Sequence, residues 1–198
     1  MTIDLRRIET ATIQARLTGW PRIIPAAHAA TPADTGFGTS RFSSATHGFR
    51  TLYAAQDFGS AFAEAVVRDR FVGKQRRYLY RPALEGLMVT EISSAPLRLL
   101  DLRGQAAYDL GIDSDAKGAR AHGAGRDLAD TIHRQTMIDG ILYHSRLSDR
   151  DCVAIFDRAF GRLRASTPIP LVTVAALTTE IERLKIVVRR RYGMPSTG

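Results

Sequence analysis

Residues 49–68, FRTLYAAQDFGSAFAEAVVR, are the stretch of the sequence that decides the fold class. The first part, residues 49–54, is rich in aromatic and β-branched side chains and predicts a strand. The part that follows carries apolar residues at helical spacing, and Asp57 stands where a helix N-cap is expected. A strand therefore leads directly into a helix, with Tyr53 closing the strand and Glu64 one to two turns into the helix.

Residues 139–151, DGILYHSRLSDRD, form the second informative stretch. An apolar run that predicts a strand opens it, and Ser145 and Arg146 stand at the end of that strand, where ligand-facing groups are common. A charged turn separates it from another expected strand over 152–156. A helix is expected before it, over 126–137, with three apolar side chains directed inward: Leu128, Ile132 and Met137.

The rest of the chain adds further expected elements. Two strands are expected over 87–92 and 97–102, separated by a turn that contains serine and proline. Residues 10–20 indicate a short helix ended by a proline, and the polar, glycine-bearing residues 104–125 indicate a long loop. A last helix is expected near the C-terminus, with these capping, inward and last-turn residues: Thr179 and Glu182; Ile181, Leu184 and Val188; Arg189 to Arg191.

This order of elements predicts an α+β fold with a single mixed, irregular sheet flanked by helices, and not a doubly wound parallel fold. A chain of 198 residues fits one domain with one good-sized core. Within it we expect an N-terminal extension of short helix and loop over 1–35 and a motif-bearing domain over 36–198.

The composition is that of an ordinary globular protein, with 44% hydrophobic and 24% charged residues. No run approaches the roughly 18 consecutive apolar residues of a membrane-spanning helix. The first residues, MTIDLRRIET, lack the layout of a secretory signal, so we expect a cytoplasmic protein. The only cysteine, Cys152, excludes an intrachain disulfide and a thiolate metal cage, and its apolar surroundings predict a buried, inert thiol.

The net charge of +8 indicates an acidic partner, whether nucleic acid, a phosphorylated small molecule or an acidic protein. Nearly all of the positive charge is arginine, because the only lysines are Lys74, Lys117 and Lys185. The planar fork of a guanidinium suits phosphate and carboxylate groups. A genomic bias towards arginine and alanine explains the composition equally well, so charge alone does not select a partner.

Each candidate residue has a structural explanation beside the functional one. Arg41, at the end of a glycine-containing loop, suits a pyrophosphate ligand, or it is a solvated surface arginine. Glu64 suits a reacting centre, or it pairs with Arg68 at the i, i+4 spacing. Ser145 and Arg146 end a strand, which is a frequent place for ligand contacts.

Other groups of residues give weaker indications of function. The histidines His28, His47, His122, His133 and His144 show no metal-ligand spacing. His144 adjoins Ser145, but neighbours on a strand point to opposite faces, which argues against a nucleophile–base pair. The segment GARAHGAG lacks the lysine and the preceding strand of a phosphate-binding loop. The tail RRRY at 189–192 reads as a solvated helix end or as a contact for nucleic acid or a partner.

Three motifs together resemble the RES family, which takes its name from a conserved arginine, glutamate and serine. They are RFS at 41–43, the LYAA stretch that ends at Glu64, and DGILYHSR at 139–146. Their order and spacing, with GRDLADTIHRQTMIDG leading into the serine strand, carry the resemblance, which spans roughly residues 36–160.

The resemblance implies a fold like that of ADP-ribosyltransferases, with NAD lying across a cleft in the sheet. Carried over by position, Arg41 would hold the phosphates, Tyr53 would line the nicotinamide–ribose region, Glu64 would serve the reacting ribose and Ser145 would complete the pocket. Arg146 would assist in binding the dinucleotide. Arg50 competes with Arg41 for the phosphates, although strand alternation puts it on the face opposite Tyr53.

The activity that the resemblance implies is that of a bacterial toxin that degrades NAD by glycohydrolysis or phosphorolysis. NAD would be the substrate, inorganic phosphate a candidate co-substrate, and no cofactor or metal would be needed. A helix-turn-helix (Xre-type) antitoxin would be the partner, with no membrane and no direct nucleic-acid contact. Two alternatives stay open, a mono-ADP-ribosyltransferase acting on protein and a non-catalytic basic module that binds nucleic acid.

Overall fold

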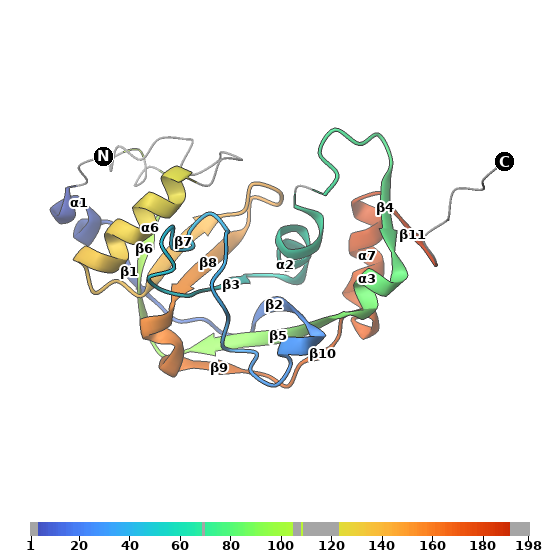
Figure 1. Ribbon diagram of the computed structural model, residues 1–198, viewed down its shortest axis with the longest axis horizontal. Helices are drawn as coiled ribbons and strands as arrows, with labels where there is room; N and C mark the ends of the chain where they lie inside the picture. The colour runs from blue at the N-terminus through green and yellow to red at the C-terminus, as the bar shows by residue number, and fades with distance from the viewer. Residues whose placement is uncertain (1–3, 69, 105–107, 109–122, 191–198) are drawn as a thin grey trace.

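The computed structural model describes residues 4–68, 70–104, 108 and 123–190. Its largest sheet has five strands in the order β1-β6-β7-β8-β3 (Figure 1). Only the β6–β7 pair is parallel, and the other pairs in this sheet are antiparallel. The bounds are Thr12–Ala15 for β1, Leu97–Asp101 for β6, Gly140–His144 for β7, Asp151–Phe156 for β8 and Thr51–Ala55 for β3.

Two smaller sheets complete the strands. In the second, β5 pairs with β2, β9 and β10, and in the third β4 and β11 pair in parallel. The α+β class with a mixed sheet is confirmed, but the strands form three sheets in place of the single one expected. The bounds are Trp20–Pro25 for β2, Arg77–Tyr80 for β4, Leu87–Ser94 for β5, Leu163–Ala165 for β9, Ile169–Pro170 for β10 and Ile186–Arg189 for β11.

The division between the first two sheets has a local cause. β1 and β2 follow each other along one side of a ladder, and β6 and β5 form the other side. In the segment between β1 and β2, the backbone N–H of Gly19 donates a hydrogen bond to the hydroxyl of Ser93 at 3.0 Å. The N–H of Leu17 donates one to the hydroxyl of Ser94, also at 3.0 Å. Gly19 has φ +64, which suits glycine, and the following Pro96 has no N–H to donate. The ladder therefore bends here.

The prediction of a helix over residues 10–20 is wrong. Residues 12–15 are a strand whose antiparallel partner is β6, and β2 begins at Trp20. The β-branched Thr12 and Ile13 favour a strand, and pairing with a distant segment overrides a weak helical pattern. The division of the chain at residue 35 stays a prediction, although β1 and β2 belong to the sheets.

The central strand–helix unit is confirmed. α2, Phe58–Phe62, follows β3 directly, and its N-cap Asp57 accepts a hydrogen bond from the backbone N–H of Ser60 at 2.8 Å. The helix continues as a π-helical turn over Ala63–Val67, which the sequence did not indicate. The N–H of Arg68 bonds to the carbonyl of Ala63 at 2.7 Å and so closes the wide turn.

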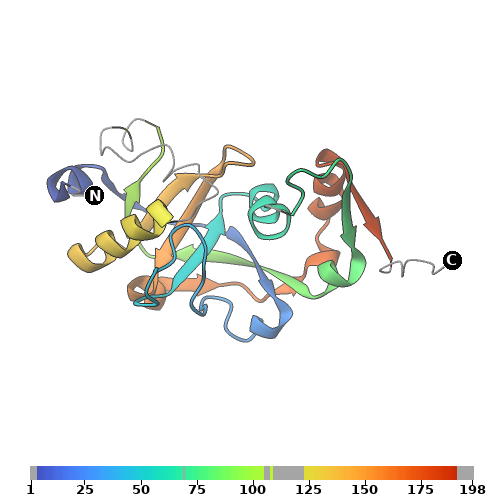
Figure 2. The same cartoon turned by 45° about the horizontal axis from the view of Figure 1, so that its top comes forward.

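The helix expected over 126–137 is α6, Gly123–Gln135. Leu128 and Ile132 are buried against the five-stranded sheet, as expected. Met137 is 71% exposed, so its inward assignment is wrong, because the helix ends before it. Figure 2 shows α6 over the sheet at one end of the molecule and α7 with β4 and β11 at the other, with α2 between them. Most of the loop expected over 104–125, including His122, lies outside the described residues.

The prediction that one helix runs to the arginines near the C-terminus is also wrong, because the helix ends earlier and a strand follows it. α7 spans Ala176–Arg183, begins without a side-chain cap and contains Thr179 within it, so the expected capping box does not form. Lys185, at φ 53, follows the helix, and β11 then begins, which places Val188 and Arg189 on a strand. Arg191 lies outside the described residues. The other helices within the described residues are α1 Leu5–Thr10, α3 Arg81–Glu85, and the 3-10 turns Ala26–His28, Asp157–Arg162 and Leu171–Thr173.

Three apolar clusters form the core. Alternate residues of β8 supply two of them, because Ala154 and Phe156 face α6 while Val153 and Ile155 face the opposite side of the sheet. The third cluster joins α2 and α7 to β4 and β5, and Phe62 is its fully buried centre. Among the described helices, none has the length and hydropathy needed to cross a membrane.

Candidate active site

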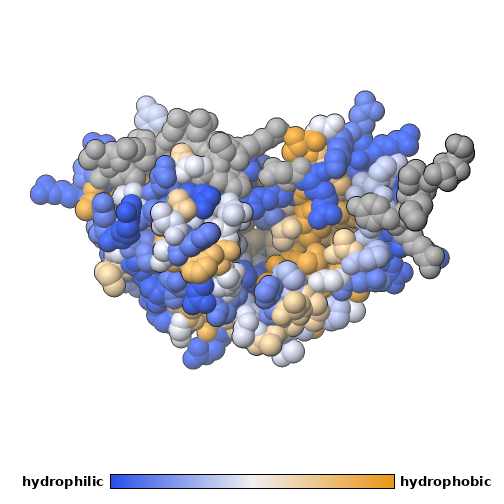
Figure 3. All heavy atoms as spheres, in the orientation of Figure 1, coloured by the Kyte–Doolittle hydropathy of each residue, from blue (hydrophilic) through white to orange (hydrophobic). Residues whose placement is uncertain are grey.

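A cavity of about 210 Å³ lies where β2, β3 and α2 meet. Figure 3 shows a hollow in the middle of the molecule, with hydrophobic surface beside it. Small apolar side chains form part of the wall, and charged and aromatic groups form the rest. The lining residues that the chemistry uses are Arg22, Ser40, Arg41, Tyr53, Glu64, Arg68, Tyr143 and Cys152.

Arg41 lies in the loop before β3 and is only 5% exposed. Its guanidinium stands 5.7 Å from the ring centres of both Phe42 and Tyr143. Burial lowers the pKa of Arg41, nearby Arg146 lowers it further, and Glu64 acts in the opposite direction. The expectation of a solvated surface arginine is therefore wrong, and an aromatic wall holds this cation at the cavity.

Tyr53 connects β3 to the same loop. Its hydroxyl oxygen accepts a hydrogen bond from the backbone N–H of Phe42 at 3.0 Å and lies 3.3 Å from the hydroxyl of Ser43. Burial raises the pKa of Tyr53 to about 12, so the phenol is neutral near pH 7. Its ring lines the cavity while its hydroxyl fixes the backbone beside Arg41.

Glu64 lies in the π-helical turn and faces the end of β7. The hydroxyl of Ser145 donates a hydrogen bond to Oε1 of Glu64 at 2.7 Å, and the hydroxyl oxygen of Ser145 accepts one from the backbone N–H of Leu147 at 3.1 Å. Ser145 is 3% exposed. The serine therefore sets the orientation of the carboxylate, and π-helical turns of this kind are frequent at functional sites.

Arg50, the competitor of Arg41, lies away from the cavity. Its Nη1 bonds to Asp34 Oδ1 at 2.7 Å, its Nε is 3.7 Å from Asp157 Oδ2, and its guanidinium stacks over Phe160. This position agrees with the alternation that puts Arg50 opposite Tyr53. The structure thus brings Arg41, Tyr53, Glu64 and Ser145 together and leaves Arg50 out.

Three residues of the wall were missed by the sequence analysis. Tyr143 precedes Ser145 by two positions in β7, and strand alternation would have placed it on the same face. Arg68 was considered only as a partner of Glu64. Arg22 gave no signal, because its strand was not foreseen; its Nη1 and Nη2 donate to the carbonyls of Tyr53 and Asp34 at 3.0 and 3.3 Å. Burial lowers the pKa of Arg22 to about 10.

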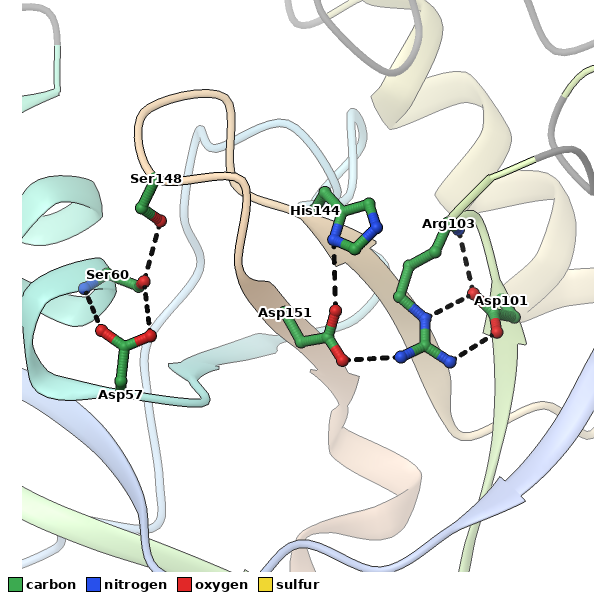
Figure 4. Close-up of polar contacts among 7 residues, drawn as sticks. All are labelled: Asp57, Ser60, Asp101, Arg103, His144, Ser148 and Asp151. Carbon is green, nitrogen blue, oxygen red and sulfur yellow. Dashed lines mark hydrogen bonds and ion pairs between the residues drawn. The ribbon is translucent and has the colours of Figure 1, made fainter.

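His144 does not serve Ser145. Its Nδ1 is 3.2 Å from Asp151, which also pairs with Arg103, and Arg103 in turn bonds to Asp101 (Figure 4). The two neighbours thus point to opposite faces, as expected for a strand. No group of three or more metal-ligating side chains occurs within the described residues.

Cys152 is 1% exposed, which confirms that the thiol is buried. Burial raises the pKa of Cys152, with the charge of Glu64 acting in the same direction, so the thiol stays protonated near pH 7. The thiol of Cys152 is part of the cavity wall and does not act as a nucleophile. The cavity thus combines the carboxylate of Glu64 with guanidinium groups and aromatic rings, a set of groups that can hold an anionic ligand and stabilise positive charge on it.

Residues 15–175 match the family model described as the RES domain. The chain belongs to the RES family. This confirms the resemblance drawn from the three motifs and extends it into β1 and β2, which lie before the first motif.

Two known proteins illustrate the relationship. The "Probable toxin y4kH" of Sinorhizobium fredii (strain NBRC 101917 / NGR234) is 35% identical over 78 residues, which cover 39% of this chain and 61% of that protein. A chain of the M. tuberculosis MbcT–MbcA toxin–antitoxin complex has the same fold, with a TM-score of 0.64 at 16% identity. That match covers 85% of this chain and 92% of the other.

Proposed function

We propose that this chain is the toxin of a toxin–antitoxin pair and that it cleaves the nicotinamide–ribose bond of NAD. The observation that carries the proposal is the position of the Glu64 carboxylate, oriented by Ser145 at 2.7 Å, in one cavity with the buried cation of Arg41. Membership of the RES family and a relative named as a probable toxin support the same reading.

The proposed chemistry follows from the charges. The bond between the nicotinamide nitrogen and the ribose carbon breaks, and its electron pair leaves with neutral nicotinamide. The ribose becomes oxocarbenium-like, and the negative charge of Glu64 stabilises it, as a carboxylate does in glycosidases. An oxygen of water or of a phosphate anion then bonds to the ribose carbon; in the reaction with water, one proton of the water is released to the solvent. Arg41 offsets the pyrophosphate charge, assisted by Arg146, and Tyr53 packs against the nicotinamide half.

The proposed partner is an antitoxin of the helix-turn-helix (Xre) type that covers the cavity. The structural match is to a chain of a toxin–antitoxin complex, which supports a partner of this kind. The pI of 10.2 favours an acidic or carboxyl-terminated covering segment. We expect the pair to act in the cytoplasm, with neither a membrane nor direct nucleic-acid contact required.

Incubation of the folded chain with NAD, with and without inorganic phosphate, tests the activity. We expect NAD to disappear and nicotinamide to appear. In the Glu64→Gln variant the charge is lost while the shape is kept, so turnover should fall by at least 100-fold, in the range of losses of electrostatic stabilisation at active sites. A fully active Glu64→Gln variant would show that the site is wrongly assigned.

The acceptor is read from the products. Free ADP-ribose indicates water, ADP-ribose phosphate indicates phosphate, and label transferred from NAD into protein indicates a mono-ADP-ribosyltransferase. A folded chain that leaves NAD intact under every condition contradicts the proposal and favours the non-catalytic alternative.

A further inference from the structure

Arg68 is a wall residue to which neither the motifs nor the proposed chemistry gives a role. It follows the π-helical turn that carries Glu64, and its side chain lines the cavity. Its Nη1 lies 3.2 Å from the hydroxyl of Ser40, the residue before Arg41. One side chain therefore joins the helix of the proposed reacting carboxylate to the loop of the proposed phosphate ligand.

The backbone at Arg68 is unusual. Its φ of 23 and ψ of −116 lie in a region that a residue with a side chain rarely adopts. Such conformations persist only where surrounding contacts maintain them, and they concentrate at ligand-binding sites. Here the strained residue turns a long cation into the cavity.

The charges around the cavity are unbalanced towards positive. Arg68 and Arg146 both act on Arg41 as like charges, and Arg68 also acts on Tyr53. Among the described residues that line the cavity, Glu64 is the only carboxylate, and it already accepts a hydrogen bond from Ser145. Like charges gathered in a partly buried space favour a ligand with more than one negative charge.

The other arginines near the site have different tasks. Arg22 donates to two backbone carbonyls that hold β2 against β3 and the loop at Asp34. Arg50 pairs with Asp34 and Asp157 outside the cavity. The hydrogen bond of Arg68, in contrast, leads to Ser40, the residue directly before Arg41.

We propose that Arg68 and Arg41 form a two-arginine clamp for the pyrophosphate of a dinucleotide, one from the helix and one from the loop. Arg68 is then a binding and specificity residue that raises affinity for diphosphates over monophosphates. The inference rests on the proposed function for the identity of the dinucleotide. Its test, however, needs no turnover.

Titration of the full chain with ADP, AMP and adenosine measures the clamp directly. A charge-assisted hydrogen bond contributes roughly 1.5–3 kcal/mol, so Arg68→Gln should weaken ADP binding by about 10- to 150-fold. AMP should be affected less and adenosine not at all. Arg68→Lys keeps the charge but loses the fork, so it should recover part of the ADP affinity.

Arg81→Gln is the matched control. Arg81 is exposed on α3 and pairs with Glu85, so this variant removes the same charge away from the cavity and should bind ADP like the unmodified chain. Circular dichroism and thermal unfolding establish that each variant is folded. A folded Arg68→Gln variant with unchanged ADP affinity overturns the clamp, as does an equal loss for ADP, AMP and adenosine.

The two proposals fail separately. If the chain releases nicotinamide from NAD but its affinity for ADP is unchanged by Arg68→Gln, the clamp is wrong and the proposed function stands. If ADP binds in an Arg68-dependent manner and NAD is never cleaved, the clamp stands and the proposed function is wrong. If the unmodified chain binds no ADP, the clamp is also overturned.

Discussion

At the scale of single residues, the site depends on how Ser145 is used. Its hydroxyl donates to Glu64 and accepts from the N–H of Leu147, so both of its hydrogen-bonding directions are committed. A buried serine in this arrangement is no nucleophile. It fixes the carboxylate on the cavity side, and activity should depend on it through the orientation of Glu64.

Ser145→Ala should lower kcat for NAD cleavage by about 10- to 150-fold, the equivalent of one hydrogen bond to a charged group. KM should change little, because the ligands of the dinucleotide remain. Steady-state kinetics measure both constants. Ser148→Ala is the control from the same turn, where the hydroxyl contacts Ser60 away from Glu64. Equal kinetics for Ser145→Ala and the unmodified chain would contradict the assigned role.

Tyr53 gives a prediction at high pH. Its pKa is raised to about 12 in the folded chain from its ordinary value of 10, so folding favours the protonated phenol. This contribution to stability is complete below pH 10 and is lost as pH rises from 10 through 12. Denaturant unfolding between pH 8 and 12 should show a smaller decline for Tyr53→Phe than for the unmodified chain. Parallel declines would show that Tyr53 titrates normally.

At the scale of elements, the start of α6 packs closely against Arg41. A Cβ on Gly125 would lie 2.6 Å from Cγ and 2.7 Å from the carbonyl oxygen of Arg41. The glycine is therefore required by the close approach of the helix to the loop. The position of Arg41 therefore depends on Gly125, although the described residues that line the cavity include no residue of α6.

Gly125→Ala should displace Arg41 and weaken binding of NAD, whereas Gly123→Ala, in the same helix turn with open space around it, should not. Glycine costs roughly 1 kcal/mol in a helix relative to alanine, so Gly123→Ala should raise stability slightly. Affinity for ADP and thermal unfolding of both variants are the measurements. If the two variants behave alike, the contact with Arg41 is not important.

The elements also show what local sequence can predict. The β3–α2 unit was predictable because its cap, spacing and strand residues are all local, and α6 had a clear apolar stripe. The π-helical turn has no local signature, and the contact that its Glu64 makes is with Ser145, 81 residues away in the sequence. β1 was taken for a helix because its pairing partner, β6, lies far along the chain.

At the scale of the whole molecule, Arg22 couples two sheets. From β2 in the second sheet it donates to the carbonyl of Tyr53 in the first, and to that of Asp34 in the loop between them. A buried guanidinium in such a place is costly unless its donors are used. The cavity thus lies at a junction of sheets that a buried cation holds together.

Arg22→Leu should lower the free energy of unfolding by about 1–3 kcal/mol, because it leaves two carbonyls without this donor. Guanidinium-induced unfolding measures the loss. The exposed Arg16, which directly follows β1, offers Arg16→Leu as a control that should change stability little. A stable Arg22→Leu variant would mean that the two sheets are held by apolar packing alone.

The division of the strands into three sheets could not be predicted from the sequence, whereas most of the candidate site residues could. Arg41, Tyr53, Glu64 and Ser145 were found by motif and do meet in one cavity region. Arg22 was not found, because it comes from a strand whose partners are distant and whose pattern is weak. The sequence thus indicates the candidate site residues, and the tertiary pairing of the strands decides which further cations surround them.

The most direct test of the account is the amount of nicotinamide released per NAD consumed by the purified, folded chain and by its Glu64→Gln variant. We predict one nicotinamide for each NAD lost with the unmodified chain, and almost none with the variant. Loss of NAD without nicotinamide, or equal release by both proteins, would contradict cleavage of the nicotinamide–ribose bond at Glu64.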